Sequence, residues 1–469
     1  PGSVMTADDR PLDDWRPMAL PQPSDPAPRS ALSRRSFLLA AGAGALGVAG
    51  CGRLTGGGGT AGGGGDGKLT FLSTQFTPVE EAERFRQILS GAYNAKPVDY
   101  VASDPAPFAD RIRSATQAGN VNFSVLGALH GQYAPVAEQL DDVSDVMQRL
   151  SGRGYAEDLK DLAKLGTQKT LYIPWSQATF IMAAHRSALD ALPAGADVNR
   201  LTYDQLLAWT QALQEKTGKP AFGLPAGPKG LLHRFLQGFT YPSFTGAAVT
   251  EFASPQAAEM WRYLQRLWKT TNPASTNYDF MQEPLVSGQA LIAWDHVARL
   301  IDAPRRKPGE FQLFPVPAGP RGRGYMSIVS GLAIPKGAPD RASAVALIEA
   351  LSKPEVQVDV LRKNAFFPAV QAPLPSDLPP GVSEEAKALQ AQQSAPDALL
   401  ALPPAGLGAR EGEFTQIYKD GFSRIVLRGE NPTAVLPELK SAVQRILNET
   451  KAPCWTPDPS SNGAPCVVK

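Results

Sequence analysis

The pattern with the clearest binding chemistry is an aromatic residue beside a carboxylate at the end of a predicted strand. Trp294 ends the strand predicted over residues 291–294, Asp295 follows it directly, and Arg299 comes one helical turn later. A sugar presents flat C–H faces and rings of hydroxyl groups, so its site needs aromatic platforms and planar polar groups in a preformed cleft. We predict that these three residues contact a ligand, with core packing as the alternative for the tryptophan.

Polar side chains follow two other predicted strands. Ser73, Thr74 and Gln75 come directly after the first strand, and His130 and Gln132 come after the third. Ligands of α/β sheets bind in the crevice beyond the strand C-termini, so these side chains are candidates for hydrogen bonding to hydroxyl groups. Helix capping is the alternative for the serine and the threonine. A structural role is the alternative for a lone histidine.

The wider sequence argues against several classes of function. The HExxH, GxSxG and SxxK signatures of common hydrolases are missing, and four scattered histidines do not have the spacing of zinc ligands. The Asp141-Asp142 pair is typical of a turn rather than of two acids that face each other across a glycosidic bond. A net charge of +1 argues against nucleic-acid binding. We predict no catalysis, no metal and no cofactor. A lipoprotein that binds a partner protein or a cell-wall fragment stays as an alternative.

Residues 33–51 carry the parts of an export signal. Arg34-Arg35 opens the segment, a run of small and apolar residues follows over 37–50, and Cys51 ends it. The run is about 14 residues long, whereas roughly 20 are needed to span a bilayer. The start resembles the twin-arginine export motif, and Val48-Ala49-Gly50-Cys51 resembles the lipobox of bacterial lipoproteins. We predict export and lipidation of Cys51, which anchors the protein to the outer face of the cytoplasmic membrane. An N-terminal helix that is amphipathic or buried is the alternative.

Composition divides the rest of the chain. Residues 1–32 are polar and proline-rich, which predicts a disordered N-terminal extension, and the glycine-rich stretch 52–67 predicts a flexible linker. The remaining body is too long for one ordinary core, so we expect two domains. Cys454 and Cys466 lie in a C-terminal tail, residues 453–469, where a disulfide that closes a small loop is the expected use in an exported protein.

The order of the predicted elements indicates an α/β fold. Strands over residues 68–73, 97–101 and 122–126 alternate with helices over 77–93 and 107–117, which is the pattern of a parallel sheet. Apolar patterns predict later helices at 202–217, 230–239, 254–269, 278–288, 340–352, 354–363, 384–393, 410–428 and 432–449. Further strands are predicted at 170–175, 179–184, 291–294, 311–314 and 327–334.

The body also resembles a known family. Seven segments carry the resemblance, in order: Leu69–Ser73, Leu140–Val143, Leu171–Trp175, Phe252–Ala257, Leu285–Ala290, Gly331–Gly337 and Ser352–Gln357. They are similar to segments of the extracellular solute-binding proteins of bacterial ABC importers, in the carbohydrate-binding class typified by maltose-binding protein. The resemblance implies two α/β lobes joined by three crossings. Lobe 1 would comprise residues 68–173 plus 326–353, and lobe 2 would comprise 174–325 plus 354–452.

The resemblance further implies a function. A monomeric, lipid-anchored protein would capture a di- or oligosaccharide between its lobes and deliver it to the permease subunits of an ABC importer. The implied site candidates lie at the crossings and along the cleft, and they are Trp175, Gln177, Phe239, Tyr241, Tyr325, Ser327 and Phe366. Core packing is the alternative for the aromatic rings.

A phosphorylated ligand, such as a glycerophosphodiester, is the second candidate within the same fold. Its negative charge would need cationic partners, and Arg299, Arg305, Arg321 and Arg323 are available in the sequence. The last three lie in a stretch rich in proline and glycine, where a solvated loop is the alternative to a phosphate site. The sequence therefore favours a sugar.

Overall fold

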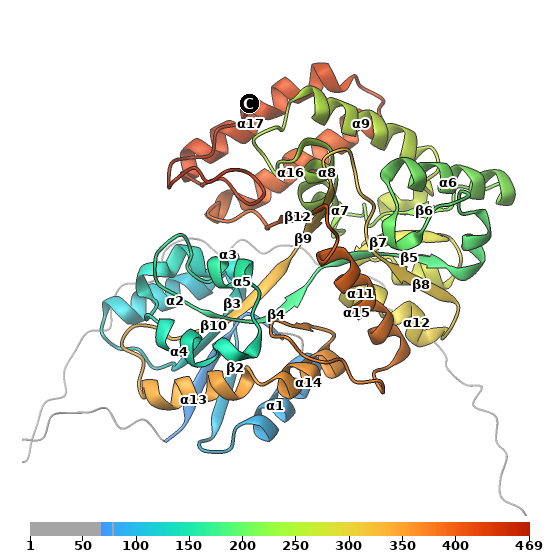
Figure 1. The fold of residues 1–469 in the computed structure, drawn as a ribbon. Helices are drawn as coiled ribbons and strands as arrows, with labels where there is room; N and C mark the ends of the chain where they lie inside the picture. The colour runs from blue at the N-terminus through green and yellow to red at the C-terminus, as the bar shows by residue number, and fades with distance from the viewer. Residues whose placement is uncertain (1–66, 77–78) are drawn as a thin grey trace, which may run out of the picture. The chain divides into compact units, whose positions relative to one another are not determined.

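Two large β-sheets organise the part of the chain that the computed structural model describes, residues 67–76 and 79–469 (Figure 1). Lobe 1 is built on a six-stranded sheet and lobe 2 on a four-stranded sheet. The predicted N-terminal extension, the export signal with Cys51, and residues 52–66 of the linker lie outside the described residues. Within the described residues, no helix is both long enough and apolar enough to span a membrane.

The lobe 1 sheet is mixed. Its strands, in spatial order, are β11 (Phe367–Pro368), β4 (Ile173–Ala178), β10 (Ile328–Ala333), β3 (Val125–Leu129), β1 (Leu69–Ser73) and β2 (Val98–Ala102). β1 runs parallel to β2 and β3, whereas β10 runs antiparallel to β3 and β4. Its main covering helices are α1 (Val79–Ala92), α2 (Pro105–Gln117), α13 (Arg341–Leu351) and α14 (Pro354–Asn364). Apolar clusters fill both faces of this sheet.

The lobe 2 sheet is smaller. Its strands, in spatial order, are β6 (Phe222–Gly223), β7 (Ile292–His296), β5 (Phe180–His185) and β8 (Phe311–Phe314). β5 is antiparallel to both β7 and β8. Residues of this sheet share one apolar core with the helices α6 (Tyr203–Thr217), α9 (Pro255–Trp268), α16 (Glu411–Gly421) and α17 (Pro432–Thr450).

Short helices fill the connections. They are α3 (His130–Tyr133), α4 (Ser144–Arg149), α5 (Glu157–Leu162), α7 (Leu232–Phe235), α8 (Tyr241–Thr245), α10 (Gln282–Val286), α11 (Val297–Leu300) and α12 (Asp302–Arg306). Two π-helical turns, η5 (Leu236–Thr240) and η8 (Phe422–Leu427), interrupt the regular helical pattern of lobe 2.

Local sequence explains where α17 forms. The side chain of Asn431 caps the helix by accepting a hydrogen bond from the Thr433 amide, and Pro432 occupies the first turn. Val435, Leu439 and Val443 recur on one face and are buried. The helix predicted over 432–449 is therefore confirmed, and its apolar face packs into the lobe 2 core.

Three segments connect the lobes. The chain passes from β4 to β5 at Thr179 and returns from β9 (Arg323–Met326) to β10 at Ser327. It crosses a third time after β11 and enters α15 (Pro380–Gln393), which packs on the lobe 2 sheet. β12 (Ala398–Ala401) follows α15 and pairs in parallel with β9. The predicted α/β fold with two lobes and three crossings is confirmed.

The boundary of the third crossing differs from the prediction, which placed residues 354 onward in lobe 2. Val356 and Val360 of α14 belong to the same apolar cluster as Phe85 of α1 in lobe 1. β11 is an edge strand of the lobe 1 sheet. The apolar face of α14 therefore keeps it in lobe 1, and the crossing begins after β11.

The C-terminal tail is a small disulfide-closed loop on lobe 2. Cys454 and Cys466 are joined, as predicted. Trp455, Cys466 and Val468 are buried and belong to the lobe 2 core. The tail is therefore an integral part of this lobe.

Candidate ligand-binding cavity

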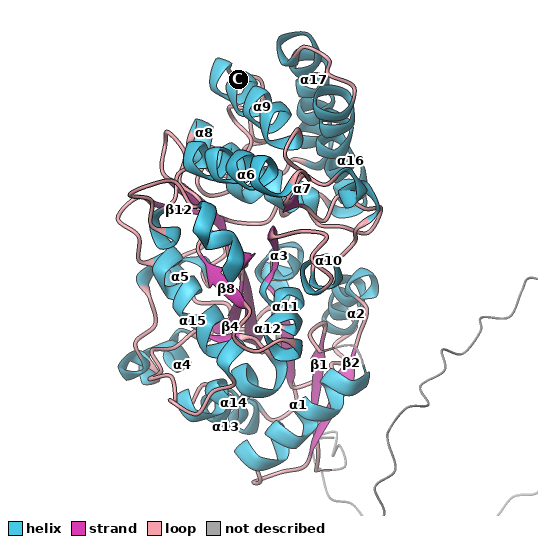
Figure 2. Cartoon of the chain, turned by 90° about the vertical axis from the view of Figure 1, so that its right-hand side faces the viewer, coloured by secondary structure: helices cyan, strands magenta, loops and turns pink. Residues whose placement is uncertain are grey.

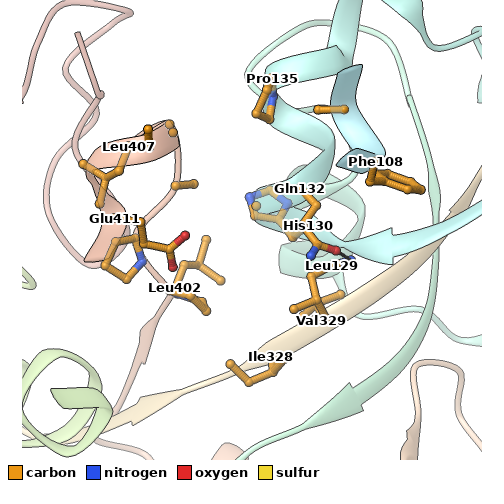
Figure 3. A pocket seen from close by; sticks show the side chains of 18 of the residues that line it. Phe108, Leu129, His130, Gln132, Pro135, Ile328, Val329, Leu402, Leu407 and Glu411 are labelled. Carbon is orange, nitrogen blue, oxygen red and sulfur yellow. Dashed lines mark hydrogen bonds between the residues drawn. The ribbon is translucent and has the colours of Figure 1, made fainter. Parts of the chain in front are cut away.

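A cavity of about 670 Å³ lies between the lobes (Figure 3). Its lobe 1 side comes from α2 and from the residues at the end of β3, and its lobe 2 side comes from Arg234, residues 402–409 and Glu411. Ser327, Ile328 and Val329, at the second crossing, join the two sides. This volume is in the range of small-molecule sites.

Gln132 positions the lobe 1 side of the cavity. It lies on α3, which begins where β3 ends, and its Oε1 accepts hydrogen bonds from the Leu129 amide at 2.9 Å and from Thr74 Oγ1 at 2.7 Å. These bonds join the ends of β1 and β3. Gln75 extends this hydrogen-bond network, because its side-chain Nε2 donates to Thr74 Oγ1 at 3.1 Å. Ser73 Oγ accepts from the Gln75 backbone amide at 3.0 Å. Ser73, Thr74 and Gln75 thus lie near the predicted place, behind Gln132 rather than in the cavity lining.

His130, which the sequence predicts as a binding residue, is part of the cavity lining. Its ring is partly buried, and its Nδ1 lies 2.9 Å from the hydroxyl group of Tyr172. Burial lowers the pKa of His130 to about 4 because the charged imidazolium loses solvation. The ring is therefore neutral at pH 7 and can form hydrogen bonds without adding charge to the cavity.

The cavity lining carries two guanidinium groups and two carboxylates, which pair with each other. Arg113 Nη2 lies 2.5 Å from Asp110 Oδ1 on lobe 1, and Arg234 Nη2 lies 3.5 Å from Glu411 Oε1 on lobe 2. Burial lowers the pKa of Arg234, but a guanidinium group has so high a pKa that it stays charged. The charges on the lining therefore balance.

Two buried polar atoms have no hydrogen-bond partner among the described residues, one on the lining residue Ser327 and one on Gln237, which contacts the lining residue Arg234. Ser327 is 3% exposed, and its Oγ makes no hydrogen bond although it lines the cavity. Gln237 accepts from Arg234 Nη1 at 3.2 Å through Oε1, while its Nε2 makes none. Gln237 lies in the π-helical turn η5, and such turns are frequent at functional sites. Leaving such a group unpaired costs about 1–3 kcal/mol, which a ligand hydroxyl in the cavity could recover at Ser327.

Four of the predicted aromatic platforms lie in the cores instead of on a cavity surface: Trp175, Phe239, Tyr241 and Trp294 are each at most 1% exposed. The Trp294 ring stacks on Phe180 with centroids 4.8 Å apart. Tyr241 stacks on Phe252 in the same way and donates its hydroxyl hydrogen to the Phe252 carbonyl. No ring face is left for a ligand at these positions, in contrast to the exposed platforms that we predicted.

The geometry of β7 explains why Trp294 and Asp295 do not form one site. Neighbouring side chains of a strand point to opposite faces, so the two residues belong to different sides of the sheet. Asp295 is buried and accepts hydrogen bonds from the amides of Met281 and His296 at 2.9 and 2.8 Å. Arg299 lies 3.4 Å from it and packs over the Phe280 ring. Burial raises the pKa of Asp295 to about 6.

A family model described as bacterial extracellular solute-binding protein matches residues 78–358, more than half of the chain. The chain belongs to this family. Its members are substrate-binding transport proteins rather than enzymes, which confirms the prediction that the chain is not an enzyme. No curated sequence matches the chain.

Solved structures share the fold of this solute-binding protein. The sugar-binding protein MalE from Xanthomonas citri is 16% identical, with 81% of this chain and 98% of that chain covered and a TM-score of 0.65. MalE3 of T. maritima with bound maltose is 17% identical, with 81% and 100% covered and a TM-score of 0.62. UgpB from Mycobacterium tuberculosis in complex with glycerophosphocholine is 17% identical, with 82% and 100% covered and a TM-score of 0.61. At sequence identities of 16–17%, the similarity to these structures shows a shared fold and nothing about the ligand.

Two other predicted site residues of the solute-binding protein line a second cavity, of about 310 Å³. Gln177 and Tyr325 lie there, and Ser327 lines both cavities. The second cavity is bounded by α5 and α15, which lie on the left of β4 in Figure 2, whereas α2 and α16 of the larger cavity lie on its right. Phe366 lines neither cavity and packs against Phe76.

The sequence prediction missed the lobe 2 side of the cavity. Arg234 lies shortly before Phe239 and Tyr241, which we predicted for their rings, and Glu411 begins a helix that we predicted without a site role. Residues 402–409 contain no periodic pattern, and they reach the cavity through contacts with residues distant in sequence. The only local sequence signal for this side of the cavity was the charge of Arg234, close to the predicted ligand residues Phe239 and Tyr241.

Proposed function

We propose that this solute-binding protein captures a neutral sugar in the larger cavity, as a monomer, and delivers it to the permease of an ABC importer. The observation that carries the proposal is a cavity of ligand size between the lobes whose charges are balanced. MalE from Xanthomonas citri is a sugar-binding protein, and MalE3 of T. maritima holds maltose, which supports a sugar as the ligand class.

The lining offers the chemistry that a sugar needs without an aromatic platform. Leu402, Leu407 and Ile328 supply aliphatic surface for the C–H faces of a pyranose ring. Arg234 and Gln132 carry donors and Glu411 carries acceptors for hydroxyl groups, which can donate and accept at once. Ser327 adds a buried hydroxyl group at the point where the lobes join.

A phosphodiester is the second candidate, because UgpB from Mycobacterium tuberculosis holds glycerophosphocholine on the same fold. The larger cavity provides little for its negative charge, since each guanidinium group in the lining already faces a carboxylate. Arg323, one of the predicted phosphate contacts, is 3% exposed and donates to the carbonyls of Val316 and Asn199 at 2.8 and 3.2 Å. The other three predicted arginines do not line this cavity.

Transport then follows from a change in the balance between open and closed forms. A ligand that contacts both lobes binds the closed form more tightly and shifts the population toward it. The three crossings are the hinge of this motion. The permease recognises the closed form, and no bond of the ligand is made or broken.

Calorimetry with the parent and with Glu411→Gln tests the ligand class. Neutral di- and oligosaccharides should give binding heat with the parent, and glycerophosphocholine should give none. Glu411→Gln leaves the Arg234 charge unmatched, so it should weaken sugar binding and strengthen phosphate binding. Heat from glycerophosphocholine alone in the parent would reverse the assignment.

Export and anchoring complete the proposal. Residues 33–51 direct the chain out of the cytoplasm, and a lipid on Cys51 holds it at the outer face of the cytoplasmic membrane. Metabolic labelling with a fatty acid should mark the parent, and Cys51→Ala should lose the label. Labelling that persists in Cys51→Ala would contradict the anchor.

A further inference from the structure

Residues 402–409, called the wall segment here, form much of the lobe 2 side of the cavity (Figure 3). Residues 402–407 belong to no helix or strand, and a single 3₁₀ turn begins at Gly408. An irregular segment has no ladder of backbone hydrogen bonds to hold its shape, so its contacts with other elements set its position. The identity of those contacts therefore matters for binding.

The first residues of the C-terminal tail supply such contacts. Trp455 Nε1 donates a hydrogen bond to the Ala405 carbonyl at 2.9 Å. The Leu402 amide donates to the Thr456 carbonyl at 3.0 Å. Trp455 is 6% exposed, and its ring contacts Phe414 of α16 with centroids 5.5 Å apart. Two neighbouring tail residues thus fix the wall segment at its start and at its middle.

The tail is itself fixed to lobe 2 at separate places. Asp458 is 7% exposed and accepts hydrogen bonds from the amides of Ala248, Val249 and Thr250 at 2.9, 2.8 and 3.0 Å. Gln444 of α17 donates to the Cys466 carbonyl at 3.0 Å and accepts from the Val468 amide at 2.8 Å. The disulfide closes the loop between these anchors. These bonds and the disulfide therefore hold the tail in a fixed position on lobe 2.

We infer that the disulfide-closed tail is a brace for the ligand cavity and that Trp455 is the positioning residue through which it acts. No tail residue lines the cavity, so Trp455 affects a ligand only through the wall segment. Opening the loop or removing the indole N–H lets the wall segment move, and a ligand must then order it on binding. The effect on affinity rests on the proposed function, whereas the position of the wall segment does not.

Hydrogen exchange in the ligand-free full chain tests the brace directly. Trp455→Phe keeps an aromatic ring against Phe414 but lacks the donor, and a Cys454→Ser, Cys466→Ser double variant opens the loop. Exchange of the Leu402 amide, which donates to the Thr456 carbonyl, should become about tenfold faster in the double variant and about threefold faster in Trp455→Phe. Val467→Ala, at an exposed tail position, is the matched control and should leave exchange unchanged.

The pattern of exchange separates positioning from general destabilisation. Peptides of α9 and of lobe 1 should keep the parent rate in Trp455→Phe, and its melting temperature should stay within a few degrees of the parent value. Unchanged exchange in the wall segment of both variants would overturn the inference. A uniform increase across lobe 2 would also overturn it, because the tail would then stabilise the lobe without setting the wall.

Calorimetry with maltose and the other saccharides of the panel then measures the consequence. A saccharide that binds the parent should bind Trp455→Phe about threefold to tenfold more weakly. If the parent binds no saccharide but the wall segment still exchanges faster in the variants, the proposed function fails and the brace stands. If saccharides bind the parent and all variants equally, the brace fails and the function stands.

Discussion

The two sides of the cavity are held in different ways. On lobe 1, His130 and Gln132 lie where β3 ends, and Gln132 is bonded to Leu129 and Thr74 at the same sheet edge. On lobe 2, the irregular wall segment and the Arg234–Glu411 pair depend on residues that are distant in sequence. The difference indicates that the lobe 1 side is preorganised by its sheet, whereas the lobe 2 side is set by tertiary contacts.

The largest effect is expected on lobe 2, at Arg234. Arg234→Met keeps an aliphatic side chain but removes the guanidinium donors and leaves Glu411 without its partner. Hydrogen bonds to charged groups contribute about 1.5–3 kcal/mol, so saccharide affinity should fall roughly 10- to 150-fold. Calorimetric titration of Arg234→Met with the saccharide that binds the parent measures this loss of affinity.

A double variant shows whether Arg234 and Glu411 act as one unit. If they do, Arg234→Met with Glu411→Gln should lose less affinity than the sum of the two single losses. Additive losses would mean that each residue contacts the ligand by itself, and the picture of a paired lobe 2 side would then be wrong.

The next effect is expected on lobe 1, at Gln132. Gln132→Leu keeps the size of the side chain but removes the acceptor for the Leu129 amide and for Thr74 Oγ1. The free energy of unfolding should fall by about 2 kcal/mol, because two polar groups lose their partner in a poorly solvated place. Urea unfolding measures this loss. An unchanged midpoint would show that the sheet edge does not need this bond.

The sequence predicted the lobe 1 side far better than the lobe 2 side, for a physical reason. Polar residues after β1 and β3 meet because parallel strands bring their C-termini to one edge, and this follows from element order alone. No comparable rule of element order predicts where the wall segment lies. It reaches the cavity because β12 pairs with β9, about 75 residues earlier in the chain, and because the tail holds it.

The buried aromatic rings illustrate a second limit of sequence reasoning. Composition identified Trp294 and Tyr241 as rings that could stack on a sugar, but the side of the strand or helix on which a ring lies decides whether it is exposed. Trp294 points into the lobe 2 core with Phe180 and Phe239. Elements with strong local signals, such as β1, α17 and the Cys454–Cys466 disulfide, were predicted correctly.

A smaller effect concerns the neutral His130 of the lobe 1 side. Burial lowers its pKa to about 4, whereas an unfolded histidine titrates near 6.5. Between these values the unfolded chain binds more protons, so stability falls as the pH falls from about 6.5 toward 4. Because the ring is partly exposed, we expect this residue to contribute about 1–2 kcal/mol to the loss.

His130→Gln isolates this contribution. The variant should lose less stability than the parent between pH 7.5 and pH 4.5, while the other titrating groups cancel in the difference. Urea unfolding at both pH values measures it. An identical pH dependence in the two proteins would mean that the ring is solvated well enough to titrate normally, and the lobe 1 side would be less enclosed than its geometry indicates.

The smallest effect is expected at Gly131, where the two sides approach each other. A methyl group at this position would lie 3.5 Å from Cβ of Ala405 in the wall segment, which is ordinary van der Waals contact. Gly131 lies in the helix α3, so Gly131→Ala should stabilise the chain by about 0.4–1 kcal/mol and change saccharide affinity by less than about threefold. Unfolding and calorimetry of the same preparation measure both quantities. A normal or raised stability combined with a tenfold loss of affinity would show that closure brings the wall segment nearer to α3 than this distance, so that lobe 2 moves against a fixed lobe 1 edge when ligand binds.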